Sequence, residues 1–203
     1  MSRLLALSIA VAAAASPCAA ATVDLTVTGA DGKPLANAAV FLESREARAA
    51  LKPVTGIEIG QLHKQFTNPV TVVPMGSEVA FPNHDKVRHH VYSFSPIKTF
   101  ELKLYNGTPS NPVLFDKSGI AVLGCNIHDN MIAWVVVVET PYYGVTGADG
   151  KAHIDNVPPG SYKLRSWQPA MVPGTPAAEQ PLVVPAAGAA LTLQMALGSA
   201  GTR

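Results

Sequence analysis

Cys125-Asn126-Ile127-His128-Asp129-Asn130-Met131 is a short stretch in which a cysteine, a histidine and a methionine follow one another at three-residue steps. Apolar residues precede it from Ile120 to Leu123 and follow it from Trp134 to Val138, and both runs are typical of strands. A loop between two strands lets three side chains at this spacing converge on one ion. Thiolate, imidazole and thioether are soft or borderline ligands that together suit copper better than other common metals. The stretch therefore predicts a copper site in a β-rich chain.

Copper sites built from one cysteine and a weak axial methionine also use two histidines, so a second histidine is expected from elsewhere. The best source is Phe81-Pro82-Asn83-His84-Asp85-Lys86-Val87-Arg88-His89-His90-Val91-Tyr92-Ser93. Here Asn83 precedes His89 by six residues, and Val91 follows the two histidines. The pattern resembles that of the small blue copper proteins (cupredoxins such as plastocyanin and amicyanin), whose first histidine ligand stands before an Asn-Val pair. The Cys-x2-His-x2-Met loop is similar to the short ligand loop of amicyanin.

The resemblance covers Gln65 to Glu139 and implies an electron-transfer site with one type I Cu(I)/Cu(II) ion. The ligands that it implies are His89, Cys125, His128 and Met131. Two positions depart from the family pattern: His90 replaces an Asn that braces the ligand loop, and Leu123 replaces a common aromatic. Asn83 and His90 are expected beside the site, and His90 is also a rival ligand. Adjacent strand residues point to opposite faces, so only one of the two histidines faces the cysteine loop in a regular strand, and we expect His89.

The same six residue types occur near both ends of the chain, Thr-Gly-Ala-Asp-Gly-Lys at Thr28 to Lys33 and again at Thr146 to Lys151. One interpretation is two unrelated Asp-Gly turns. The other is that both ends resemble halves of a carboxypeptidase-regulatory-like (transthyretin-like) β-sandwich, which the Pro158-Pro159-Gly160-Ser161-Tyr162 motif also favours. Some exported methylamine-utilisation proteins combine such halves with a copper domain, and the chain resembles them.

The predicted fold is all-β: a cupredoxin-like Greek-key β-sandwich inserted between two halves of a regulatory-like β-sandwich. The expected boundaries are 1–21 for a signal peptide, 22–59 for the first half with a linker, 60–140 for the copper domain, 141–197 for the second half and 198–203 for a flexible tail. The copper domain should bind copper without its flanks. In the alternative, the terminal strands complete the cupredoxin sheets within one continuous domain. The best helix candidate is Glu43 to Leu51.

The first residues predict export. Arg3, the apolar run from Leu4 to Ala15 and the small residues before Ala21 describe a secretory signal peptide, which indicates the periplasm. Its removal takes Cys18 away and leaves Cys125 as the one thiol, so no internal disulfide can protect it. Of 15 Lys and Arg, removing Arg3 leaves 14 against 14 Asp and Glu. This balance gives no electrostatic case for binding nucleic acid.

These observations favour a monomeric carrier of single electrons, with no membrane anchor, that exchanges them with a redox partner of the cytochrome or dehydrogenase type. His128 is the expected electron port, and an apolar patch beside it is expected from Ile127, Met131, Ile132 and Ala133. Core packing is the alternative for Ile132 and Ala133. Alternatives are a copper chaperone or store with the same ligands, and a non-redox β-sandwich binding module. No Ser/His/Asp set or paired-carboxylate motif indicates an enzyme.

Overall fold

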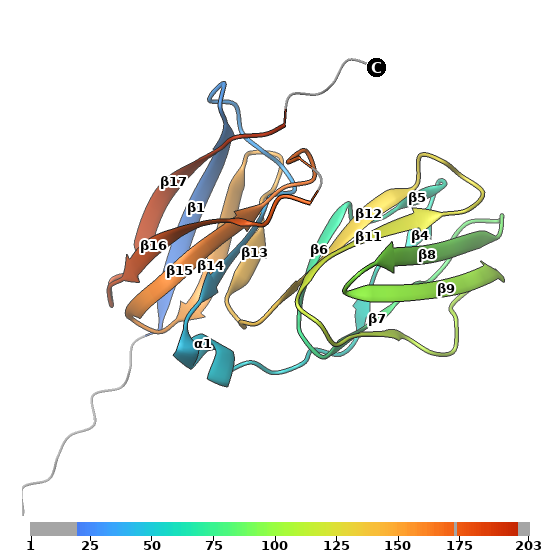
Figure 1. Ribbon diagram of the computed structural model, residues 1–203, viewed down its shortest axis with the longest axis horizontal. Helices are drawn as coiled ribbons and strands as arrows, with labels where there is room; N and C mark the ends of the chain where they lie inside the picture. The colour runs from blue at the N-terminus through green and yellow to red at the C-terminus, as the bar shows by residue number, and fades with distance from the viewer. Residues whose placement is uncertain (1–19, 173, 199–203) are drawn as a thin grey trace, which may run out of the picture.

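Alternation of apolar and polar residues gives the chain seventeen strands and one short helix in the computed structural model, which describes residues 20–172 and 174–198. The elements are β1 (Ala21–Gly29), β2 (Ala39–Glu43), α1 (Arg45–Ala49), β3 (Ile57–Glu58), β4 (Gln61–Leu62), β5 (Gln65–Phe66), β6 (Val70–Pro74), β7 (Ser77–Ala80), β8 (His89–Ser95), β9 (Lys98–Tyr105), β10 (Val113–Phe115), β11 (Gly119–Cys125), β12 (Ile132–Val138), β13 (Tyr143–Val145), β14 (Lys151–Val157), β15 (Gly160–Trp167), β16 (Ala178–Val184) and β17 (Ala189–Met195). The all-β prediction is confirmed, and the strands form two β-sandwiches that lie side by side (Figure 1).

Strands from both ends of the chain build the first sandwich, here called the terminal sandwich. One sheet has the order β14-β1-β17 and the other β13-β2-β15-β16. Strand β1 runs parallel to β17 and antiparallel to β14, so the N-terminal strand depends on C-terminal residues for its backbone partners. Its side chains alternate between buried and more exposed positions, with Val23, Leu25 and Val27 in the core. The sequence itself predicts this half-buried pattern, since the polar Asp24, Thr26 and Thr28 alternate with these apolar residues.

The repeated six-residue motif forms the same turn twice. In each copy the first glycine N–H bonds the lysine carbonyl, at 2.9 Å for Gly29 and Lys33 and 3.0 Å for Gly147 and Lys151. In each copy an Asp carboxylate accepts the lysine N–H, and the second glycine, Gly32 or Gly150, has a positive φ of 78° or 73°. At Gly150 a Cβ would stand 2.6 Å from the Val27 carbonyl oxygen. The two turns are thus equivalent in structure, and they belong to one sandwich.

Strands β3 to β12 form the second sandwich, here called the central sandwich. A five-stranded sheet of order β6-β12-β11-β8-β9 faces a sheet of order β10-β7-β3, and β4 and β5 form a small hairpin. Phe81, Phe115, Leu123 and Val135 belong to the core between them. Strand β3 pairs with β7 and begins at Ile57, slightly before the expected boundary at residue 60.

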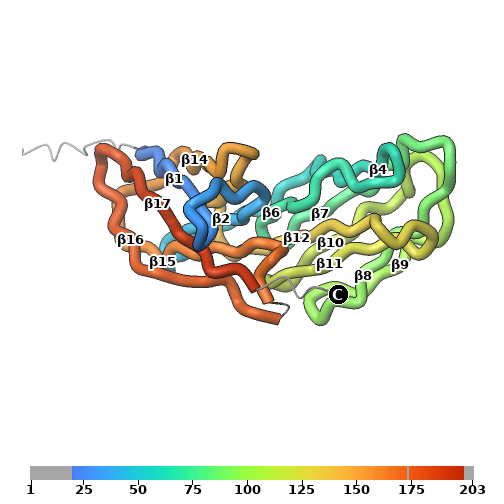
Figure 2. Tube along the Cα trace, turned by 90° about the horizontal axis from the view of Figure 1, so that it is seen from above, coloured from blue at the N-terminus to red at the C-terminus, as the bar shows by residue number. Residues whose placement is uncertain are grey.

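Strands β6 and β12 carry apolar residues on both faces, and most of these residues are buried. One face packs in the central sandwich, and the other joins the terminal core through Val70, Val72, Val136 and Val138. At the rim of this contact, the rings of Trp134 and Trp167 lie 6.3 Å apart. Figure 2 shows the two sandwiches in contact along β2, β6 and β12. Cutting the chain at 60 and 140 would therefore uncover an apolar sheet face.

The helix is shorter than the predicted Glu43 to Leu51. Ser44 caps α1 by accepting the Ala47 N–H at 3.0 Å, and the helix ends at Ala49. Pro53 restricts Lys52, the residue before it, to extended conformations, so the helix could not have continued past Leu51. Within the described residues, no helix is long and apolar enough to cross a membrane. Residues 1–19 of the expected signal peptide and 199–203 of the expected tail lie outside the described part of the chain.

Candidate metal centre

Two histidines and the cysteine of the predicted site meet at one end of the central sandwich. The Sγ atom of Cys125 lies 3.7 Å from Nδ1 of His89 and 3.8 Å from Nδ1 of His128. All three potential ligand atoms lie within 4.8 Å of one another, and the two imidazole rings are 5.0 Å apart. His89 and Cys125 are buried, whereas His128 is partly exposed. The fold thus brings together His89 and Cys125, which are 36 residues apart in the sequence.

The strand pairing explains this convergence. Strand β11 ends at Cys125, which pairs with Val91 of β8, so the inward faces of the two strands carry Cys125, Val91 and His89. The loop after Cys125 turns back at once. Asn126 N–H donates to the His90 carbonyl at 3.1 Å, and Met131 N–H donates to the His128 carbonyl at 3.0 Å. These bonds bring the His128 ring over the end of the sheet.

His90 points away from the cluster, as alternation along β8 predicts. Its side chain lies edge-on to Tyr92 and has Nε2 3.6 Å from a Glu101 carboxylate oxygen. A register shift lies between the pairs His89↔Tyr105 and Val91↔Leu102, which places the extra residue in β9 rather than in β8. His90 contributes to the ligand loop through its backbone carbonyl, a role that its side-chain type does not reveal.

Met131 is 1% exposed and belongs to the same apolar core as Cys125. Of the four residues expected to form an apolar patch, Ile127 and Ile132 are about half exposed, at 48% and 49%, whereas Met131 and Ala133 are buried. The patch prediction is wrong for Met131, and for Ala133 the core-packing alternative holds, because β12 begins at the exposed Ile132 and its alternation turns Ala133 into the core. The exposed apolar surface beside His128 thus consists of Ile127 and Ile132.

Asp85 is a participant that the sequence reasoning missed. Its Oδ2 atom lies 2.8 Å from Nε2 of His89, and its carboxylate also accepts the backbone N–H groups of His63 (2.7 Å) and Lys64 (2.8 Å). Burial alone would raise the pKa of Asp85, but the hydrogen bonds from Lys64, His89 and His63 outweigh it and hold that pKa below its usual value. An ionised Asp85 accepts a hydrogen bond from the Nε2–H of His89, which leaves Nδ1 as the ring nitrogen directed at Cys125. The signal available in the sequence was an acid four residues before the histidine.

Asn83 holds the segment that carries Asp85 and His89. Its Nδ2 donates to the carbonyls of Val87 (2.9 Å) and Tyr105 (3.0 Å), and its Oδ1 accepts the Asp85 N–H at 2.9 Å. Both polar atoms of its side chain are engaged in fixing the chain. Burial raises the pKa of Tyr105, whose hydroxyl donates to Gln61 and to the Phe81 carbonyl. The phenol therefore stays protonated in this polar layer.

The remaining histidines lie outside the cluster. His63 and His84 are exposed near Asp85, and His153 pairs with Asp24 on the terminal sandwich. What the cluster can do follows from its donors: a thiol and two imidazole Nδ1 atoms, held by strand pairing and by Asp85, fit a soft or borderline metal ion. The roles of His89, Cys125, His128 and Met131 as ligands stay predictions.

Comparison with known proteins gives likenesses of limited extent. No protein-family model matches the sequence, and no curated protein matches it. Among solved structures, the chain is similar to a mutant of amicyanin in the Cu(I) form, at 19% identity and a TM-score of 0.37, over 49% of this chain and 98% of that one. A purple cupredoxin from Nitrosopumilus maritimus matches at 20% identity and 0.36, over 42% and 99% of the two chains. Amicyanin from Paracoccus versutus matches at 17% and 0.35, over 49% and 97%.

Proposed function

We propose that this protein binds one copper ion through His89, Cys125, His128 and Met131 and carries single electrons between periplasmic redox partners. The observation that supports this most directly is the approach of the His89, Cys125 and His128 ligand atoms to within 4.8 Å of one another. A lone cysteine beside two imidazoles matches the ligand preference of copper. When bound, copper supplies a one-electron couple.

The chain's own residues keep this site rigid. The paired strands β8 and β11 fix His89 and Cys125, and Asp85 fixes the orientation of the His89 ring through its 2.8 Å contact. A site on strand ends that is held by surrounding hydrogen bonds changes little in geometry. Little movement favours fast electron exchange, because each change of oxidation state then demands little reorganisation.

Burial favours electron transfer over the chaperone or storage alternative. His89 is 0%, Cys125 5% and Met131 1% exposed, so an incoming ligand from another protein could reach little more than His128. A chaperone has to release its ion by ligand exchange, which calls for accessible ligands. A carrier needs only one ligand edge near the surface. His128, flanked by Ile127 and Ile132, is that edge, and small contact areas suit brief redox encounters.

The terminal sandwich supports the wider resemblance to exported methylamine-utilisation proteins with regulatory-like β segments. Its sheets combine strands from both ends of the chain, and the central sandwich lies between them in sequence. We assign it a structural role, as a base that covers the outer face of β6 and β12. The partner is a protein of the cytochrome or dehydrogenase type, and the carrier acts as a monomer.

Replacing the cysteine tests the proposal. The full chain supplied with Cu(II) should develop the strong visible band of a copper–thiolate bond, and Cys125→Ser should remove that band while circular dichroism shows an intact β-fold. Voltammetry should then give a reversible one-electron wave for the original protein. A coloured serine variant would exclude the site. A coloured protein without a reversible wave would favour storage.

A further inference from the structure

A two-residue turn beside the cluster carries unusual residues for its conformation. His63 and Lys64 connect β4 to β5, and both have positive φ angles, 54° and 59°. Turns of this kind strongly favour Asn-Gly, because most other residues pay a steric cost in the left-handed region. Asp85 compensates by accepting both backbone N–H groups. The turn therefore keeps a histidine and a lysine where glycine would be easier, which indicates a role for their side chains.

These residues line a hollow of about 460 Å³ at the surface. Its lining comes from the β4–β5 hairpin and from the segment before β8: Leu62, His63, Lys64, His84, Asp85, Lys86 and Val87. Leu62 and Val87 expose 42% and 41% of their surface, so the hollow has apolar walls between its polar groups. Figure 1 shows the β4–β5 hairpin at the end of the central sandwich where β11 and β12 are joined, away from the terminal sandwich.

The charge of this hollow is positive. Asp85 is its one acidic residue, and the Asp85 carboxylate is already bound by His89, His63 and Lys64. Lys64, Lys86 and the neighbouring Arg88 are exposed, and none of them belongs to an ion pair in the described part of the chain. Because no carboxylate of the described residues pairs with these cations, their positive charge is available to attract an anionic group beside the apolar walls of the hollow.

We propose that this hollow, formed by the β4–β5 turn and the segment from His84 to Val87, is a docking surface for an acidic protein partner. Carboxylates of the partner contact Lys64 and Lys86, and its apolar side chains pack on Leu62 and Val87. Asp85 lines the hollow and also contacts His89, so a partner docked here lies one hydrogen-bonded residue from the cluster. Electron exchange with this partner rests on the proposed function, whereas the docking of the partner is independent of it.

A redox-inactive anion tests the docking surface without relying on copper. Hexacyanochromate(III), [Cr(CN)6]3−, is paramagnetic and broadens the amide signals of residues that it approaches. In nitrogen-15 spectra of the full chain, broadening should concentrate on His63, Lys64, His84 and Lys86. A decaglutamate peptide should then displace the complex and shift the same signals, and salt should weaken both effects.

Charge reversal sharpens the test. Lys64→Glu with Lys86→Glu should weaken hexacyanochromate binding by about tenfold or more, because two attractive charges become repulsive. Lys64→Gln with Lys86→Gln should give an intermediate loss. The matched control, Lys117→Glu with Lys151→Glu, changes the net charge equally at exposed lysines outside the hollow and should retain the binding. Equal losses in both pairs, or broadening spread over all lysines, would exclude a built surface. Binding of the chromium complex without displacement by decaglutamate would exclude an acidic polypeptide as the occupant.

Discussion

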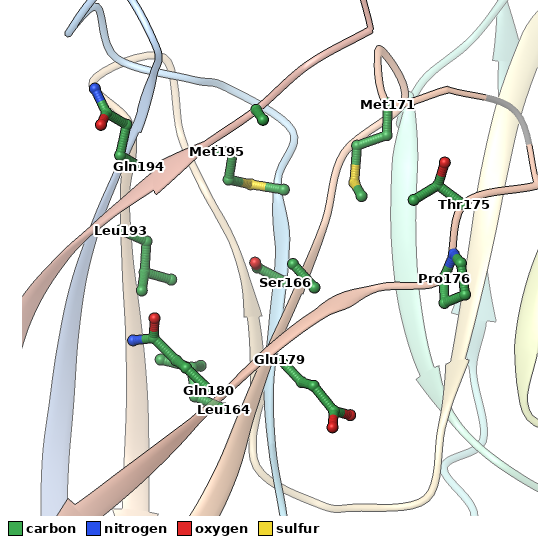
Figure 3. A pocket seen from close by; sticks show the side chains of 12 residues that line it. Leu164, Ser166, Met171, Thr175, Pro176, Glu179, Gln180, Leu193, Gln194 and Met195 are labelled. Carbon is green, nitrogen blue, oxygen red and sulfur yellow. The ribbon is translucent and has the colours of Figure 1, made fainter.

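Both halves of the molecule are β-sandwiches, but among the described residues only the central sandwich brings potential metal ligands together at one end. At its outer end the central sandwich brings together a cysteine, two histidines and Asp85. The terminal sandwich also has a hollow, of about 410 Å³, between β15, β16 and β17. Figure 3 shows its interior lined by Leu164, Met171, Leu193 and Met195, with Glu179, Gln180 and Gln194 around them. No imidazole or thiol lines it.

The difference lies in the connections rather than in the sheets. The connection between β15 and β16 borders the terminal hollow, and its lining residues Met171, Thr175 and Pro176 offer neither an imidazole nor a thiol. The central sandwich joins β11 to β12 through the ligand loop, and it precedes β8 with a segment that Asn83 pins in place. A β-sandwich is therefore only the support, and function depends on the residues that its loops carry.

The largest expected effect is a difference in copper binding between alanine variants of two neighbouring residues of the central sandwich. His89→Ala removes an imidazole from the cluster and should abolish or strongly weaken the copper–thiolate band. His90→Ala removes a ring that points away, toward Tyr92 and Glu101, and should leave a coloured protein. Absorption spectra after Cu(II) titration distinguish the variants.

Added imidazole serves as the control for this pair. It should restore colour to the His89 variant by filling the vacated position, and it should change the His90 variant little. The reverse pattern, with colour lost only in the His90 variant, would contradict the observed register of β8 and β11.

The next effect concerns the contact between the sandwiches. Val136→Asp places a charge where 2% of the side chain is exposed, between β12 and the terminal core, and should lower the free energy of unfolding by about 3–5 kcal/mol. Val183→Asp is the matched control, because Val183 is 68% exposed. Urea denaturation measures both. Similar, small losses would mean that the sandwiches do not depend on this contact, and a separate 60–140 fragment would then be expected to fold.

The sequence predicts the sheets well and their contact poorly. Alternation in Val23 to Val27 and the Asp-Gly repeat both reflect local rules, so they can be read without a structure. The burial of Val70, Val72, Val136 and Val138 by a second sandwich cannot be read in this way. A run that is apolar on both faces indicates burial on both sides, but it does not say which element covers it.

A smaller effect tests the support of His89. Asp85 has a lowered pKa in the folded protein, so its ionised form stabilises the fold above about pH 4, and this contribution is lost as the pH falls through the lowered value. Asp85→Asn should reduce the free energy of unfolding by about 1–2 kcal/mol at pH 7, because charge-assisted hydrogen bonds are weakened. The difference in free energy of unfolding between this variant and the original protein should become smaller below about pH 4.

Asp129→Asn is the control for this change, since Asp129 is an exposed acid in the ligand loop. Its stability should follow that of the original protein at every pH. An Asp85 variant whose deficit grew as the pH fell would contradict the assigned direction of the pKa shift.

As with the fold, part of the candidate site could be predicted from the sequence and part could not. The spacing of the ligand loop indicates Cys125 and His128, alternation leaves one of the two neighbouring histidines facing them, and the cupredoxin resemblance selects His89. Asp85 escaped notice because its role needs three donors from distant parts of the chain, the His63 and Lys64 N–H groups and the His89 ring. The failure of Met131 and Ala133 as surface residues has a local cause, since it depends on where β12 begins.

The smallest effect compares one glycine from each sandwich. A Cβ at Gly124, next to Cys125, would stand 2.7 Å from the Tyr92 ring, whereas at Gly144 in β13 the nearest atoms are 3.4 Å away. Gly124→Ala should therefore cost about 1 kcal/mol, a modest overpacking penalty because the partly exposed Tyr92 can move outward. Gly144→Ala should be neutral or slightly stabilising, since alanine restricts the unfolded chain. Adding Tyr92→Ala to the Gly124 variant should remove the clash, so the double variant should be no less stable than Tyr92→Ala alone. Equal stabilities for the two glycine variants in urea denaturation would show that the Tyr92 ring does not cover Gly124.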